Sequence, residues 1–143
     1  MIETLNIYLS GGMTGLSKED QMTWRTQVQN AIKYGDYNYK KKPVFFDPTQ
    51  YYSLFVQEHK SEREVFEFDL NALRRSDLVV VNFNKPNSIG TAFELAIAKE
   101  RRTPIVGLNR DKNKLHPWLQ ESCTRMCDNM RELVDYIVEF YLQ

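Results

Sequence analysis

The chain has 143 residues, 42% hydrophobic and 27% charged, which is typical of a globular protein with one domain, here residues 1–143. Nineteen Lys and Arg balance nineteen Asp and Glu, so no overall charge attracts nucleic acid, and no apolar run reaches the ~20 residues of a membrane span. The start lacks a signal-peptide pattern, and Cys123 and Cys127 match neither a redox nor a zinc spacing, so we expect a cytoplasmic protein with reduced cysteines.

The first half of the chain alternates strand and helix patterns. The predicted elements are a strand at Leu5–Leu9, a helix at Ser17–Tyr34, a strand at Pro43–Phe46 and a helix from Ser61 to about Arg75. The first strand leads into a glycine-rich turn, SGGMTG. Ser61 followed by Glu64 is a capping-box pattern, which marks the start of the second helix.

The second half continues the alternation. The predicted elements are a strand at Leu78–Phe83, a helix capped by Ser88, a strand at Pro104–Leu108, a short helix at Pro117–Glu121, a short strand at Thr124–Cys127 and a final helix capped by Asp128. The run LVVVNF is almost continuously β-branched, which is typical of a strand buried on both faces.

This alternation predicts an α/β fold, with a parallel sheet of about five strands in the flavodoxin-like or Rossmann-like order 2-1-3-4-5 and helices on both faces. Such sheets bind ligands at the carboxyl ends of their strands, where the strand order switches. We therefore expect the loop at residues 10–15, the start of the second helix and the turn before Ser88 to converge on one site.

Glu94 is the first candidate for chemistry. It lies in the second turn of the helix NSIGTAFELAIA, where its neighbours on the same face include Thr91 and Ile97. Ser88 is a natural N-cap, Gly90 permits close approach to the backbone, and the helix start favours an anion. A carboxylate one turn above an anion site is placed to act as a nucleophile or base. The alternative is a surface glutamate in a favourable position on the helix dipole.

Asp69 and the first loop are further candidates. Asp69 lies within an apolar helical stripe, where a carboxylate needs partners; it is either a site residue or a structural aspartate. The turn SGGMTG could cradle a phosphate or a sugar, or be a plain tight turn. Tyr8 and Asn82 lie on strands near the expected site, although such residues are often core. Two carboxylates without metal ligands favour chemistry at a carbon centre that can carry positive charge.

Other features receive simpler interpretations. His59 and His116 remain unassigned, and no metal or cofactor is predicted. The segment YGDYNYKKK resembles a nucleic-acid stacking surface, but with zero net charge a solvated loop between two elements is the favoured interpretation. Trp118 is a candidate interface anchor.

The segments IYLSGGMTG, FDP, EFDLNALRRSDLVVVNF and SIGTAFELAIAKERRTPIV together resemble the nucleoside 2-deoxyribosyltransferase family, over about residues 5–108. The resemblance implies that Glu94 is the nucleophile, which forms a covalent glycosyl intermediate. It implies that Asp69 contacts the base and assists proton transfer to the departing nitrogen, and that Tyr8 holds the nucleophile in place. The expected substrate-binding residues are Ser10, Gly11, Gly12, Thr14, Asn82, Ser88, Gly90 and Thr91.

The pattern also departs from the family. Many of the transferases have an acidic residue where this chain has Ser88, and in this the chain is similar to deoxynucleoside 5′-monophosphate N-glycosidases. Those enzymes have an arginine in the first loop, where this chain has Thr14. Transfer and hydrolysis therefore both remain open, as do nucleoside and 5′-monophosphate substrates. The resemblance also implies a homo-oligomer, a dimer or larger. The alternative function is a non-catalytic nucleotide-binding module on the same fold.

Overall fold

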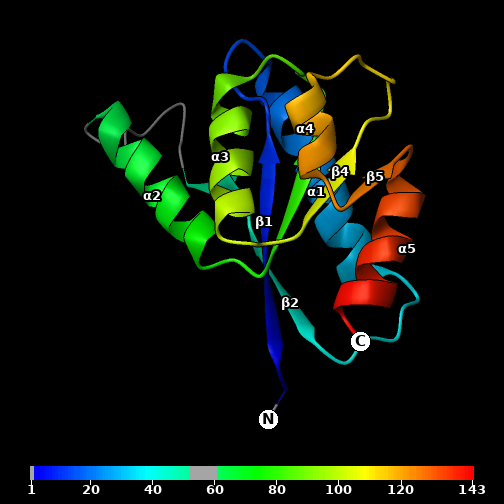
Figure 1. Ribbon diagram of the computed structural model, residues 1–143. Coiled ribbons are helices and arrows are strands. Elements are labelled where there is room, and N and C mark those ends of the chain that lie inside the picture. Colours follow the sequence, from blue (N-terminus) through cyan, green and yellow to red (C-terminus); the bar gives the residue numbers. More distant parts are fainter. Residues whose placement is uncertain (1, 52–60) are drawn as a thin grey trace.

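The computed structural model describes residues 2–51 and 61–143. Within these ranges five parallel strands form one sheet in the order β2-β1-β3-β4-β5, which confirms the predicted fold (Figure 1). The strands are β1 (Thr4–Gly11), β2 (Lys42–Phe46), β3 (Leu78–Asn82), β4 (Ile105–Leu108) and β5 (Arg125–Cys127). The helices are α1 (Lys18–Tyr34), α2 (Glu62–Arg74), α3 (Ile89–Glu100), α4 (Pro117–Ser122) and α5 (Met130–Tyr141), with a short 3-10 helix η1 (Pro48–Gln50).

The two faces of the sheet carry different helices. On β1 the side chains of Ile7 and Leu9 pack into the core beneath α1 and α5, whereas Tyr8 packs into the core beneath α2 and α3. Alternate residues of a strand point to opposite faces, so Ser10 shares the face of Tyr8. This alternation directs two polar side chains at the end of β1 toward α3.

The predicted helix starts are mostly confirmed. Ser17, Ser61 and Ser88 are the N-caps of α1, α2 and α3, and each side chain accepts a hydrogen bond from a backbone amide three residues on. The prediction for α5 was wrong by one residue, because Asn129 rather than Asp128 is the cap. Asn129 Oδ1 accepts from the Glu132 amide at 2.8 Å. Asp128 instead forms an ion pair with Lys112 at 2.8 Å.

The lengths of β1 and β2 shape the site. β1 runs two residues past its predicted end, because Ser10 and Gly11 pair with β3. β2 ends at Phe46, opposite Tyr8. The last part of β1 therefore pairs with β3 only. Its other edge, beyond the end of β2, has no strand partner and can accept hydrogen bonds from side chains.

The segment that joins α1 to β2 packs against α5. The Tyr37 hydroxyl donates to Asp135 Oδ1 at 2.8 Å, and the amides of Lys40 and Lys41 donate to the Leu142 carbonyl. Tyr37 and Tyr39 are partly buried against the core. The interpretation as a solvated loop was therefore only partly correct, since these two rings pack against the core whereas Tyr34 is 83% exposed. Among the described residues, none of the helices combines the length and the apolar character needed to cross a membrane.

Candidate active site

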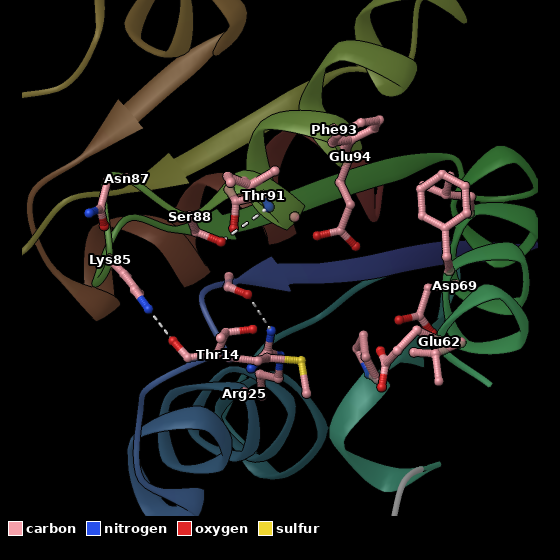
Figure 2. Close-up of a pocket in the computed structure, with 18 residues that line it drawn as sticks. Thr14, Arg25, Glu62, Asp69, Lys85, Asn87, Ser88, Thr91, Phe93 and Glu94 are labelled. Carbon is pink, nitrogen blue, oxygen red and sulfur yellow. Dashed lines mark hydrogen bonds between the residues drawn. The ribbon is translucent and has the colours of Figure 1, made fainter. Parts of the chain in front are cut away.

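A pocket of about 630 Å³ lies at the carboxyl end of the sheet, between α2 and α3 (Figure 2). The first loop, η1, α2, the turn after β3 and the start of α3 all contribute to it. Glu94 and Asp69 both line this pocket. The predicted convergence of these segments is therefore present. The pocket is also large enough for a small ligand, because ligand sites usually have volumes of ~300–1,000 Å³.

The Glu94 carboxylate is held by two hydroxyl donors from β1. The Tyr8 hydroxyl donates to Glu94 Oε2, and Ser10 Oγ donates to Oε1 at 2.9 Å. Tyr8 and Ser10 are fully buried, whereas Glu94 itself is only partly exposed and borders the pocket. One carboxylate thus has both oxygens oriented by residues of a rigid strand, which is how a reacting group is kept in place.

The surroundings of Glu94 raise its pKa to about 7. Burial is the main cause, because it disfavours the charged form, and the nearby Asp69 charge adds to it. The hydrogen bonds from Tyr8 and Ser10 and the charge of Arg25 act in the opposite direction. Burial also raises the pKa of Tyr8, so its hydroxyl remains a proton donor. Glu94 is therefore poised between its acid and carboxylate forms near neutral pH.

Asp69 reaches the same pocket from α2. It is partly exposed, and its helix turns the buried Leu70 and Leu73 toward the sheet. Figure 2 shows the Asp69 and Glu94 side chains entering the pocket from α2 and α3. Two carboxyl groups from different helices therefore line one cavity.

Polar groups gather where α3 starts. Ser88 Oγ accepts from the Thr91 amide at 3.3 Å, and both residues line the pocket. Thr91 is 3% exposed, and its Oγ1 has no hydrogen-bond partner among the described residues. A Cβ atom added at Gly90 would meet nothing within 4 Å, so ligand can approach the backbone there. This end of the pocket suits a polar or anionic group.

The two adjacent glycines, Gly11 and Gly12, pack against different side chains. Gly11 lines the pocket, and an added Cβ would lie 2.9 Å from the Trp24 ring. Gly12 packs under the Lys85 side chain, where an added Cβ would lie 2.6 Å from Lys85 Cβ. Neither Gly12 nor the buried Asn82 is part of the pocket wall. Thr14 does line the pocket, and its carbonyl accepts a hydrogen bond from Lys85.

The pocket contains charged and aromatic residues that were not predicted as site residues. Arg25 and Lys85 bring positive charge to it, and Phe66 and Phe93 form an aromatic pair at its wall, with ring centroids 5.9 Å apart. Phe93 directly precedes Glu94 in the sequence, so the segment that pointed to Glu94 also contained this aromatic residue. Arg25 follows Trp24 on the apolar side of α1, which is an unusual place for a charge.

His116, the histidine within the described residues, does not line this pocket. His116 caps α4, where its Nδ1 accepts from the Trp118 amide, and His59 lies outside the described residues. Within residues 2–51 and 61–143, no cluster of His, Cys, Asp and Glu could hold a metal ion. A second cavity, of about 720 Å³, lies between α3 and α4 and includes Trp118, which is 82% exposed. Neither Glu94 nor Asp69 lines it.

Comparison with known proteins identifies a family. The family model described as nucleoside 2-deoxyribosyltransferase matches residues 7–139. A comparison of the sequence with curated proteins finds no match.

Solved structures share the fold. A conserved protein from Enterococcus faecalis V583 is 15% identical, with a TM-score of 0.74 over 95% of this chain and 98% of that one. The 2-deoxyribosyltransferase from Bacillus psychrosaccharolyticus is 17% identical, with a TM-score of 0.72 over 92% and 91%. The CMP N-glycosidase BcmB from Clostridium botulinum is 14% identical, with a TM-score of 0.63 over 96% and 99%. At these identities the likeness establishes the fold alone.

Proposed function

Because the chain belongs to the nucleoside 2-deoxyribosyltransferase family, whose enzymes transfer or hydrolyse at N-glycosidic bonds, we propose that it cleaves the N-glycosidic bond of a 2′-deoxynucleoside or its 5′-monophosphate. Glu94 is the proposed nucleophile. The observation that carries the proposal is the Glu94 carboxylate itself, oriented by Tyr8 and Ser10 and sharing one pocket with Asp69.

The proposed reaction has two steps at the anomeric carbon. In the first, a Glu94 oxygen forms a bond to C1′ while the bond from C1′ to the base nitrogen breaks, and Asp69, which must first take up a proton, delivers it to the departing base. In the second, water or another base attacks C1′, Asp69 takes the proton from the attacking group, and the ester bond to Glu94 breaks. Two inversions give net retention, through transition states that resemble an oxocarbenium ion.

The groups around Glu94 suit this role. A carboxylate that is poorly hydrated and fixed on both oxygens stabilises positive charge on the sugar without waiting for solvent to reorganise. The hydroxyls of Tyr8 and Ser10 hold it in one orientation. Its pKa of about 7 leaves a large fraction ionised at neutral pH.

The start of α3 is the proposed subsite for the 5′ end of the sugar. Ser88 and Thr91 offer hydroxyls and the helix N-terminus offers positive potential, which suit either a 5′-hydroxyl or a 5′-phosphate. Lys85 favours the phosphate, because it lines the same pocket and carries a positive charge. It could replace the arginine of the 5′-monophosphate N-glycosidases, whose position in this chain is Thr14, and it donates a hydrogen bond to the Thr14 carbonyl. Hydrolysis and transfer differ only in whether water or a base takes the sugar.

Product analysis tests this proposal. The protein is incubated with the four 2′-deoxynucleosides and their 5′-monophosphates, with and without a free acceptor base, and the products are separated by chromatography. Glu94→Gln is the test variant, and Glu139→Gln, an exposed glutamate of α5 outside the pocket, is the matched control. Release of base by the wild type and the control, with loss in Glu94→Gln, supports the proposal. New nucleosides that form only with an acceptor would identify a transferase. Binding without turnover would favour a nucleotide-binding module instead.

A further inference from the structure

Arg25 is a buried cation that the proposed mechanism does not use. Its side chain comes from α1 and is 1% exposed. Nε donates to the Leu9 carbonyl at 3.2 Å, Nη2 to the Gly11 carbonyl at 3.3 Å and Nη1 to the Gln21 carbonyl at 2.5 Å. Removing a guanidinium from water carries a large desolvation cost, so this place must compensate for it.

The hydrogen bonds of Arg25 replace a missing strand. Along this stretch the carbonyls of odd-numbered and even-numbered residues point to opposite sides. The Glu3 carbonyl points toward β2 and accepts from the Lys42 amide, whereas the Asn6 carbonyl points toward the β3 side and accepts from the Asp77 amide. β2 ends opposite Tyr8, so the carbonyls of Leu9 and Gly11 face no strand. The Arg25 fork satisfies both, which fixes the segment between them. That segment includes Ser10, a donor to Glu94.

A counter-charge accompanies the arginine. Asp47, directly after β2, lies 3.8 Å from Arg25 Nε and is 3% exposed. Asp47 Oδ1 accepts from the amide and hydroxyl of Thr49, and Oδ2 accepts from Gln29. Its charge is thus fixed in position, and it partly offsets the positive charge of Arg25.

Arg25 and Glu94 lie on opposite sides of the end of β1, and both border the pocket (Figure 2). Four groups act on the Glu94 carboxylate: Tyr8 and Ser10 from β1 as donors, Asp69 from α2 as a negative charge and Arg25 from α1 as a positive charge. Burial and Asp69 favour the protonated form, whereas the hydrogen bonds from Tyr8 and Ser10 and the charge of Arg25 favour the carboxylate.

We propose that the Arg25–Asp47 pair is a positioning device for Glu94: the guanidinium braces the end of β1 that holds the carboxylate, and the balance of the two charges sets how far Glu94 is ionised. This rests on the proposed function, in which Glu94 reacts as the carboxylate. Arg25 acts here through Glu94 and not on the substrate.

The pKa of Glu94 can be measured without substrate. Protein with carboxyl-¹³C glutamate is titrated by NMR, and the Glu94 signal is assigned by its loss in Glu94→Gln. In Arg25→Met the pKa of Glu94 should rise, since a nearby opposite charge is removed. Arg25→Lys keeps the charge and should show less than half of that rise. Asp47→Asn removes the counter-charge and should lower the pKa.

Each outcome bears on the proposal. An unchanged Glu94 pKa in Arg25→Met, or a rise in Arg25→Lys as large as in Arg25→Met, would overturn it. Backbone amide spectra show whether each variant is folded. If Arg25→Met is unfolded, Asp47→Asn decides, and a Glu94 pKa that stays constant or rises there would also overturn the proposal. The proposed function fails separately, if Glu94→Gln retains turnover.

Discussion

Tyr8 of β1 donates a hydrogen bond to Glu94 of α3, although the two residues are 86 positions apart in the chain. The contact depends on the alternation of β1, which points Tyr8 and Ser10 to one face, and on the N-cap at Ser88, which sets where Glu94 falls on α3. A strand and a helix start thus define the position of one carboxylate.

Replacing Tyr8 with Phe removes a donor to Glu94 and keeps the buried ring. The pKa of Glu94 should rise, because the hydrogen bond favours its charged form. We expect kcat to fall roughly 10- to 100-fold at pH 7, because less carboxylate is present and its orientation is less fixed. Tyr37→Phe, which loses a hydroxyl bonded to Asp135 on the other face, is the control. Equal losses of rate in the two variants would argue against a specific role for Tyr8.

Asp69→Asn removes both the acid–base group and its negative charge, and each loss has its own readout. Loss of general acid–base catalysis should lower kcat by ~10²- to 10⁴-fold. The pKa of Glu94 should fall at the same time, because a nearby negative charge disappears. The acidic limb of the residual pH–rate profile therefore moves to lower pH. A limb that moves to higher pH would contradict the electrostatic coupling of the two carboxyl groups.

The raised pKa of Glu94 also affects stability. Its pKa in the folded protein is about 7, against 4.5 for an ordinary glutamate. The folded state therefore holds the proton more tightly, so this contribution to stability is complete below pH 4.5 and is lost as the pH rises toward 7 and above.

Glu94→Gln removes this titration. The variant should therefore be more stable relative to the wild type at pH 8 than at pH 4.5. The difference in free energy of unfolding, variant minus wild type, should be larger at pH 8 by ~1–3 kcal/mol. Urea denaturation of both proteins at the two pH values measures this difference. A stability difference that is independent of pH would mean that the Glu94 pKa is not raised.

Phe93 and Phe66 are expected to contact the flat face of a base. Each is about half exposed at the pocket wall, at 51% and 49%. Phe93→Leu should raise KM several-fold with a smaller change in kcat, because stacking on an aromatic ring contributes ~1–3 kcal/mol per base. Phe140→Leu, an exposed phenylalanine on α5, should leave both constants unchanged. A change confined to kcat would place Phe93 in the chemical step instead.

Lys85→Met tests which substrate class the α3 subsite prefers. If the 5′-phosphate binds there, kcat/KM for monophosphates should fall at least ten-fold, because one charge-assisted contact is lost. The value for nucleosides should change little. Lys114→Met, an exposed lysine outside the pocket, is the control. Equal losses for both substrate classes would mean that Lys85 acts through the first loop, which it contacts at Thr14.

The fold and the paired carboxylates could be predicted because both depend on local patterns. The β-branched run of β3 and the serine caps of α1, α2 and α3 are readable within a few residues. The cap of α5 was misplaced, because Asp128 and Asn129 are both good caps and an ion pair with Lys112 occupies one of them. Local pattern alone does not distinguish such neighbours.

The positively charged residues of the pocket, Arg25 and Lys85, could not be predicted in the same way. Arg25 reaches the site because β2 ends early and leaves two carbonyls of β1 exposed to it. Lys85 reaches it because Gly12 leaves room for its side chain. Both depend on how distant segments meet, which no spacing within the sequence records. The role of each predicted site residue stays a prediction until variants are measured.

Trapping the intermediate tests the central claim most directly. The protein is mixed with the 2′-deoxynucleosides and with their 5′-monophosphates, quenched in acid within one turnover, digested with pepsin and analysed by mass spectrometry. The account predicts a deoxyribosyl or phosphodeoxyribosyl group on the peptide that contains Glu94, and none in Glu94→Gln. Turnover with a sugar adduct on another residue, or with none at any quench time, would contradict it.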